Sequence, residues 1–381
     1  MNTFRFVGKI KKVEDKKDKK FIETLTFEKS GWELTRIKFR LNTEDAGEWL
    51  EISGGKFKDD SKNTVYTQFV KEGSTNKRDV ENAQVKWAER FDPAVVEKVP
   101  DFRKYTIDLA SDKIREALIK EGKNEEASAL AEKKYVYIST YDFAKKFEEL
   151  LTSGAFGEEN YVITGTIEYS YSPTKDTYYR NFVPTNIYKA SADEAVGCFG
   201  KLDFYYNKET VVGEATESGD IPLTGNIQFY DKMSKKYYFA ETVLLIRNEM
   251  QNKDGLVKMF QKMGDADAET LVIGLNVKFF SGSPKTEINV DELSDDQKQL
   301  IEWGVKTMED IIADMGGQAY GDKVSVIYVE KLSRGYANGP QKTDITLGQL
   351  SEKPTGEKVD GTTTKTASKK QFDLFSDDDE I

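Results

Sequence analysis

The sequence predicts a mainly β protein with helices, of the α+β class, whose first half closes into a small barrel. Three observations lead to this prediction: alternating apolar residues over residues 1–41, a helical apolar stripe over residues 141–151, and a long hairpin pattern over residues 161–190. An alternation of period two is typical of a strand with one buried face. A repeat of three to four residues is typical of an amphipathic helix.

The first 41 residues predict three successive antiparallel strands. Phe4, Phe6 and Ile10 supply the apolar positions of the first strand, and the alternation resumes over residues 21–27 and 32–41. A lysine- and aspartate-rich stretch and a Ser-Gly pair separate the three segments and are turn signals. Because strands joined by short turns pair with their neighbours, we expect a meander.

A helix and a hairpin follow later in the first half. The predicted helix carries one apolar stripe, formed by Phe143, Phe147, Leu150 and Leu151. Residues 161–190 predict a strand, a turn around Pro173 and a return strand. A meander, a helix and a hairpin are the elements of the OB-fold in their usual order. The helix placed before the hairpin, with Gly165 early in its first strand, resembles the single-stranded DNA-binding protein family. This resemblance implies an OB-like barrel that binds single-stranded DNA.

The same patterns predict the domain organisation. Residues 43–132 mix strand and helix signals, and we interpret them as a large insertion into an OB-like DNA-binding domain that spans residues 1–190. Residues 191–345 are expected to form a second β-rich domain, for which a second OB-like barrel is one alternative. Apolar residues become rare after residue 336, so residues 346–381 are expected to be a disordered linker and an acidic interaction tail.

The second half repeats a part of the first. The tetrapeptide Thr-Gly-Asn-Ile at 224–227 lies 60 positions after Thr-Gly-Thr-Ile at 164–167. An aromatic residue, a basic turn and a Tyr-Tyr pair follow in both places. Similarity at a fixed offset indicates duplication. Duplication of the hairpin is better supported than duplication of a whole domain, and both alternatives are kept.

Composition excludes several classes of function. The chain has 381 residues, no histidine and one cysteine, Cys198, so zinc sites of the Cys/His type and an internal disulfide are excluded. Walker loops, nucleophile elbows and dinucleotide-binding glycine patterns are absent, and we expect no enzyme activity, no metal and no cofactor. The sequence has no long apolar run and no apolar leader at its start. We therefore expect a cytoplasmic protein without membrane contact, in the host bacterium if a phage encodes it.

Charge is distributed unevenly along the chain. The formal net charge is −11, which disfavours contact with phosphate groups. Residues 1–40, however, hold twelve Lys and Arg against six Asp and Glu, a local net charge of +6. A basic face on an acidic body is compatible with a nucleic-acid groove, and a solvated hairpin is the alternative.

The last eleven residues, QFDLFSDDDEI, combine two signals. The first five are similar to the Q-x-D/S-L-F peptide with which bacterial replication and repair proteins dock on the sliding clamp. The acids that follow resemble the partner-binding tail of bacterial and phage single-stranded DNA-binding proteins. A few such side chains can supply most of the binding affinity. The candidate partner-binding residues are Gln371, Phe372, Asp373, Leu374, Phe375, Asp377, Asp378 and Asp379. A merely solubilising tail is the alternative.

Binding of single-stranded DNA without sequence preference needs aromatic faces for the bases and cations for the backbone. The first sheet and the 161–190 hairpin offer both, and Phe39 is a further aromatic residue there. The candidate DNA-binding residues are Lys9, Trp32, Lys38, Arg40, Tyr169, Tyr171, Lys175, Tyr178 and Arg180. Each aromatic residue has a place in the core as its alternative. Because Tyr178 and Tyr179 are adjacent on a strand, we expect at most one of them to face DNA.

The sequence therefore predicts a single-stranded DNA-binding protein of a phage-like replication, recombination or repair system. Its expected partners are single-stranded DNA and, through the tail, the sliding clamp or other replication proteins. The alternative is a clamp-binding adaptor or inhibitor without DNA affinity, which an acidic body would suit. A magnesium-dependent nuclease is a third and more distant alternative.

Overall fold

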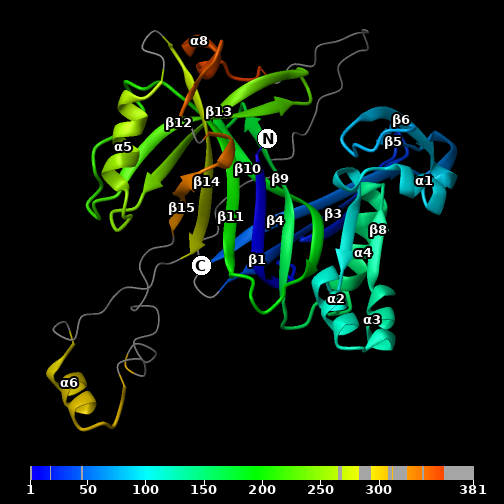
Figure 1. Ribbon diagram of the computed structural model, residues 1–381, viewed down its shortest axis with the longest axis horizontal. Helices are drawn as coiled ribbons and strands as arrows, with labels where there is room; N and C mark the ends of the chain where they lie inside the picture. The colour runs from blue at the N-terminus through cyan, green and yellow to red at the C-terminus, as the bar shows by residue number, and fades with distance from the viewer. Residues whose placement is uncertain are drawn as a thin grey trace.

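The computed structural model describes residues 2–17, 19–43, 46–264, 268–282, 293–307, 311, 324–336 and 339–355 (Figure 1). Strands dominate this part of the chain and helices lie around them, so the prediction of a mainly β protein with helices is confirmed. Within it, no helix combines the length and the apolar character needed to cross a lipid bilayer.

Five strands form the first barrel: β1 (Thr3–Lys11), β3 (Trp32–Asn42), β4 (Gly47–Phe57), β9 (Asn160–Ser172) and β10 (Thr177–Lys189). Antiparallel ladders join β4 to β3, β3 to β1, β1 to β9 and β9 to β10. Strand β10 lies against β4 and completes the ring. Numbered along the chain, the strands follow one another around the ring in the order 1-2-3-5-4. Helix α4 (Thr140–Thr152) lies between the third and fourth strands. This arrangement is an OB-fold, as predicted.

Alternation along the strands decides which side chains enter the first barrel. Phe4, Phe6 and Ile10 of β1 are buried, and Phe39 of β3 lies in the same core. The ring of Phe39 packs on Phe147 of α4 with centroids 4.6 Å apart. Ser139 starts this helix, because its hydroxyl accepts a hydrogen bond from the backbone N–H of Asp142. A further strand, β2 (Ile22–Phe27), pairs with β3.

Five later strands form a second barrel: β11 (Gly197–Tyr206), β12 (Ile221–Asp231), β13 (Lys236–Ile246), β14 (Leu271–Gly282) and β15 (Val324–Leu332). Strand β11 pairs with β12 and β14, β12 pairs with β13, and β15 pairs with β14. A parallel contact between β13 and β15 closes the ring. The order is again 1-2-3-5-4, and helix α5 (Lys253–Lys262) lies between the third and fourth strands. The second half is therefore OB-like as well.

Strand β1 takes part in the sheets of both barrels. One of its edges pairs with β9. Along the other edge, residues 3–7 pair with β11 and residues 9–11 pair with β3. Gly8 stands where the partner changes, and a Cβ there would lie only 2.4 Å from the carbonyl oxygen of Asn42. Glycine allows the two partner strands to meet at this point.

The interiors of the two barrels form one apolar core. Side chains of directly paired residues share a face of the sheet, so β1 and β11 turn their buried residues to the same side. There Phe6 meets Phe182 at 4.7 Å and Phe279 of the second barrel at 5.9 Å between ring centroids. Phe182 and Phe279 are 5.0 Å apart. These edge-to-face contacts join the barrels through buried rings.

The insertion lies between β4 and α4. Its elements are η1 (Asp60–Lys62), β5 (Thr64–Val70), β6 (Val80–Lys86), η2 (Trp87–Glu89), α1 (Pro93–Lys98), η3 (Asp101–Arg103), β7 (Tyr105–Asp108), α2 (Asp112–Lys120), α3 (Asn124–Ala131) and β8 (Lys134–Tyr137). Strands β5 and β6 form their own sheet, while β7 pairs in parallel with β10. The expected start at residue 43 was wrong, because β4 is the third strand of the first barrel.

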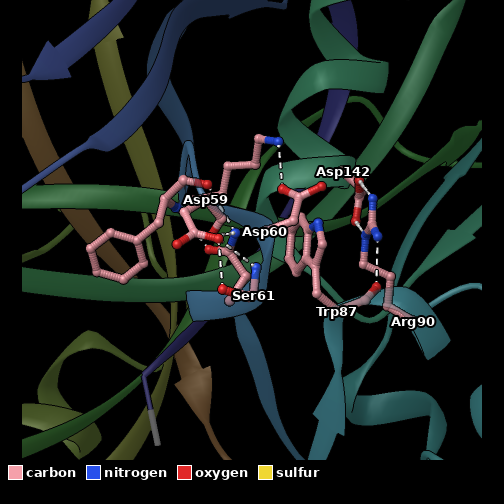
Figure 2. Close-up of polar contacts among 9 residues, drawn as sticks. Asp59, Asp60, Ser61, Trp87, Arg90 and Asp142 are labelled. Atoms are coloured by element: carbon pink, nitrogen blue, oxygen red, sulfur yellow. Dashed lines mark hydrogen bonds and ion pairs between the residues drawn. The ribbon is translucent and has the colours of Figure 1, made fainter.

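Arg90 holds the insertion on the first turn of α4 (Figure 2). Its Nε donates to Oδ2 of Asp142 at 2.8 Å, and its Nη1 donates to the carbonyl of Trp87 at 2.6 Å. The guanidinium also lies 3.9 Å from the centre of the Trp87 ring. Beside this contact, Lys56 at the end of β4 is 3.0 Å from Asp60. The insertion therefore fixes the end of β4 and the start of α4.

The two similar hairpins have the same turn but different places in the barrels. Their turns span residues 173–176 and 232–235, and each ends with a residue of positive φ, Asp176 at 49° and Lys235 at 56°. Strands β9 and β10 are the fourth and fifth of the first barrel, whereas β12 and β13 are the second and third of the other. The repeat is therefore one of hairpins and does not align the two barrels.

Beyond the barrels, the structure describes α6 (Asp295–Glu302), η6 (Arg334–Tyr336), β16 (Gln341–Lys342) and α8 (Leu347–Ser351). Helix α8 begins with a capping box between Thr346 and Gln349 and packs on β13 with Leu350 buried. The expectation of disorder from residue 346 onward was wrong for α8. The sequence signal for α8 is the capping box itself, a Thr followed three residues later by a Gln.

Candidate nucleic-acid interface

The outer surface of β3 and β4 gathers cations and aromatic rings. On β3 the buried residues alternate with Trp32, Arg36, Lys38 and Arg40, which therefore point out of the barrel. The register places Phe57 opposite Trp32 and Trp49 opposite Arg40. We call this surface the β3–β4 face and define it by Trp32, Arg36, Lys38, Arg40, Trp49 and Phe57. Phe39 is absent from it because its side chain is fully buried.

An aromatic group lies at each end of the β3–β4 face. At one end Trp32 meets Phe57 edge-to-face at 4.9 Å. The Trp32 ring covers Gly55 so closely that a Cβ there would lie 2.4 Å from it. Phe27 stands opposite Trp32 on β2 and is 48% exposed. At the other end Trp49 stacks on the buried Phe21, with centroids 5.4 Å apart and 12° between the planes.

The cations between these aromatic groups contact carboxylates. Arg36 lies 3.1 Å from Glu23 and 3.5 Å from Glu51, and Lys38 lies 3.9 Å from Glu51. Burial raises the pKa of Glu51, and burial also lowers the pKa of Lys38. The guanidinium of Arg40 lies over the Trp49 ring at 5.7 Å. A phosphate group reaching Arg36 or Lys38 would therefore have to compete with Glu51.

Lys9 continues the basic surface onto β1. It is exposed, and its Nζ is 3.4 Å from Glu158, which also contacts Lys11. Lys11 is paired with Arg40 in the β1–β3 ladder, so its side chain and that of Arg40 share a face. Trp32, Lys38, Arg40 and Lys9 thus belong to one outer surface, and their contact with DNA stays a prediction.

The tyrosines of the 161–190 hairpin lie elsewhere, at the contact between the barrels. Tyr169 and Tyr178 pack on Phe229 of β12 at 6.5 Å and 5.9 Å, and Tyr171 packs on Tyr178 at 5.0 Å. Tyr238 belongs to the same cluster. The hydroxyl of Tyr169 is buried, and burial raises its pKa.

These positions change the expected roles of the hairpin residues. The ring of Tyr169 is enclosed, so the stacking role that we expected for it does not fit. Tyr178 is half-buried in the same cluster and is mainly a packing residue. Tyr171 lies nearer the tip, where its hydroxyl donates to Asp176 at 2.6 Å, and Lys175 is exposed beside it. Among these candidate residues, Tyr171 and Lys175 are the accessible ones.

Arg180 lies at the junction of the barrels. Its guanidinium covers the rings of Phe182 and Phe279 at 5.2 Å and 4.8 Å. Nearby, burial raises the pKa of Glu48 to about 7, although Arg180 and Arg40 act to lower it. Because Arg180 packs against rings and next to a buried carboxyl group, the DNA contact that we expected for it does not fit. The sequence could not reveal this, since the Phe279 ring comes from the other barrel.

The candidate partner-binding residues, 371–375 and 377–379, lie outside the described residues. Within the described residues, no group of three or more Asp, Glu or Cys residues is arranged to hold a metal ion.

Comparisons with known proteins add little to this geometry. No family model and no curated protein matches the chain. A crystal structure of the wild-type single-stranded DNA binding protein from Thermus aquaticus is similar, with 7% identity and a TM-score of 0.32, over 88% of this chain and 92% of that one. A deletion mutant of the same Thermus protein is similar as well, with 7% identity and a TM-score of 0.32, over 88% of this chain and 94% of that one. The fold assignment therefore rests on the strand order: the chain is an OB-fold protein with two barrels.

Proposed function

We propose that the chain is a single-stranded DNA-binding protein of a phage-like replication or recombination system. The observation that carries this proposal is the β3–β4 face, with three cations between two aromatic groups. In OB-folds the second and third strands and the loops beside them form the surface that takes oligonucleotides, and β3 and β4 are these strands. Aromatic rings and cations are the groups that hold an unpaired strand without regard to sequence.

The β3–β4 face supplies each part of such a contact. Trp32 and Phe57, with Phe27 beside them, offer rings on which bases stack, and Arg36, Lys38 and Arg40 offer charge to the backbone. Stacking contributes about 1–3 kcal/mol per base, so a few rings can offset the repulsion of an acidic body. Lys9 on β1 lies beside this surface and extends the proposed site, and Tyr171 and Lys175 would contact the strand separately, near the contact between the barrels.

We further propose that residues 371–381 recruit replication proteins, the sliding clamp among them. The tail would follow a DNA-binding domain of residues 1–190 and a second domain of residues 191–345, in a protein that works in the bacterial cytoplasm. Support for this part comes from the sequence alone, from Gln371, Leu374, Phe375 and the acids after them.

Fluorescence anisotropy with labelled oligothymidine at two salt concentrations tests DNA binding. We expect binding that weakens as salt rises, because each phosphate contact releases condensed counterions. Absence of binding at low salt would leave the second candidate, a clamp-binding adaptor or inhibitor. The net charge of −11 and the carboxylates beside Arg36 and Lys38 favour that candidate.

Deletion of residues 371–381 tests the tail. We expect the shortened chain to lose capture by an immobilised sliding clamp, while its affinity for oligothymidine stays equal or rises because acidic residues have been removed. A variant with Leu374→Ala and Phe375→Ala keeps the charge and should lose clamp capture to the same extent. Clamp capture that survives both changes would disprove the role of this peptide.

A further inference from the structure

The strands at the barrel junction form one continuous outer surface. Strands β9, β1, β11, β14 and β15 lie side by side (Figure 1), and their ladders align residues across all five. One such row runs from Thr3 to Lys201, then to Asn276, and then to Lys331. The core lies behind this sheet, so the row lies on its outer side. A surface thus extends from the first barrel onto the second.

A hollow of about 620 Å³ lies in this row. It is lined by Lys201, Asn276, Lys331, Leu332, Ser333 and Gly335. The short helix η6 crosses the sheet beside it, and the ring of Tyr336 covers Gly274, where a Cβ would lie 2.5 Å from the ring. Gly274 therefore lets η6 approach the sheet and form one wall of the hollow.

The lining of the hollow is rich in donors and cations. Lys201 and Lys331 are exposed, and among the residues that the structure describes no carboxylate lies within 4.0 Å of either ammonium group. This distinguishes them from Lys9 and Arg36, which contact glutamates. The amide of Asn276 donates to the Leu332 carbonyl at 3.1 Å, which orients it at the edge of the hollow.

Two acidic residues stand close to these lysines: Asp203, two residues from Lys201 and opposite Gly274 in the β11–β14 ladder, and Glu330, which precedes Lys331 and contacts Arg247 at 2.8 Å. Lys278 stands on the same side of β14, opposite Phe199 and Tyr328. The surface around the hollow therefore carries three lysines and two half-exposed rings against Asp203 and Glu330, and Arg247 already pairs with Glu330. This composition favours an anionic ligand with flat groups attached to it.

We propose that the hollow between Lys201 and Lys331 binds phosphate groups of the same DNA strand that the β3–β4 face holds. This inference rests on the proposed function. The outward residues Lys11, Lys9 and Arg5 of β1 connect the two places, because β1 pairs with β3 at one end and with β11 at the other. A strand that leaves the β3–β4 face along β1 reaches Lys201 without leaving this surface.

Oligonucleotide length separates this inference from the proposed function. A single OB barrel occupies about 4–16 nucleotides, so oligothymidine of roughly 8 nucleotides fills the β3–β4 face and one of roughly 30 nucleotides reaches both places. The test variant is Lys201→Glu with Lys331→Glu. Its matched control is Lys258→Glu with Lys262→Glu on the exposed side of α5, which changes the net charge equally.

We expect the test variant to bind the long oligonucleotide roughly 20-fold more weakly than the control at ~0.1 M salt, and the short one equally well. Each lost phosphate contact lowers the slope of log affinity against log salt by about 0.7, so the slope should fall by about 1.4. Circular dichroism and thermal unfolding verify the folding of both variants. Lys201→Gln with Lys331→Gln removes the two charges without reversing them, and is the milder version of the test variant.

Three other outcomes overturn the inference. Equal affinities of test and control variants for the long oligonucleotide would show that the hollow does not contact the strand, while the proposed function stands. An equal loss with short and long oligonucleotides would indicate a general charge effect instead of a second contact. If the unaltered chain binds no oligonucleotide, the proposed function fails and this inference with it.

Discussion

The two barrels share one strand order but differ on the face that their second and third strands present. In the first barrel this is the β3–β4 face, with Arg36, Lys38 and Arg40 between aromatic groups. In the second it is the outer side of β12 and β13, which carries Thr224, Asn226, Gln228, Glu241 and Val243 and contacts α8. Side chains on one face of a strand can change without altering the core on the other. Tyr230 and Tyr237 give the second face an exposed aromatic pair as well, so the three cations are what distinguishes the β3–β4 face.

The largest expected effect tests the aromatic side of this comparison. Trp32→Ala with Phe57→Ala should weaken oligothymidine binding by about 4 kcal/mol, roughly 1000-fold, because two stacking platforms are lost. The matched control is Tyr230→Ala with Tyr237→Ala, an exposed pair at the tip of β12–β13 with centroids 5.2 Å apart. Anisotropy titration of both should show a change below about twofold in the control. The opposite ranking would move the site to the second barrel.

The two halves of the chain also differ in the charge that they bury. The first half buries Glu48, Asp108 and Arg115, whereas the buried polar residues described in the second half are Ser234 and Thr270. Burial raises the pKa of Glu48 from its ordinary value of 4.5 to about 7 in the folded chain. Between these values the folded state holds a proton that the unfolded state has released. Stability should therefore decrease as pH rises through this window.

Glu48→Gln should remove this decrease. Near pH 5 the variant and the unaltered chain should unfold at similar denaturant concentrations, because the carboxyl group is neutral in the folded state. Near pH 8 the variant should be more stable by roughly 3 kcal/mol, since one pKa unit corresponds to about 1.4 kcal/mol. Denaturant titration at both pH values measures the difference. A variant that is less stable at pH 8 would mean that the charged carboxylate stabilises the junction through Arg180 and Arg40.

The smallest effect concerns the carboxylate that competes for the cations. Glu51→Gln should strengthen oligothymidine binding about fivefold at ~0.1 M salt. The neutral side chain no longer pairs with Arg36 and Lys38, so the charge of roughly one cation becomes available to a phosphate group. Glu241→Gln on β13 makes the same chemical change on the corresponding face of the second barrel and should have no effect. If both variants bind more tightly by the same factor, only the net charge matters and the β3–β4 face has no special role.

Much of the fold could be predicted from local patterns. Alternation in β1 and β3 and the apolar stripe of α4 each reflect one element in contact with one core. Strand β4 could not be recognised from the sequence, because Trp49 faces outward and Gly54 and Gly55 interrupt the alternation of apolar residues. A Cβ at Gly54 would lie 2.3 Å from the Thr140 carbonyl oxygen, so this interruption serves the packing of α4.

The site was harder to predict than the fold. Lys38 and Arg40 could be selected because alternation along one strand determines their direction. Tyr169 and Arg180 alternate equally well, but the rings from the second barrel that they pack against, Phe229 and Phe279, lie 60 and 99 residues further along the chain. Lys201 and Lys331 come together only through the register of β11, β14 and β15. A pattern within one segment contains none of this information.

The sharing of β1 affects how the chain must fold. Apart from its short ladder with residues 40–42 of β3, this first strand finds its partners at residues 160–166 and 197–201, so during synthesis most of its pairing waits for about half of the chain. Contacts so distant in sequence make assembly slow and leave apolar strand edges accessible in the meantime. The amino-terminal strand should consequently be the part of the nascent chain that depends most on chaperones, and a fusion that crowds it should reduce soluble yield more than one placed at the other terminus.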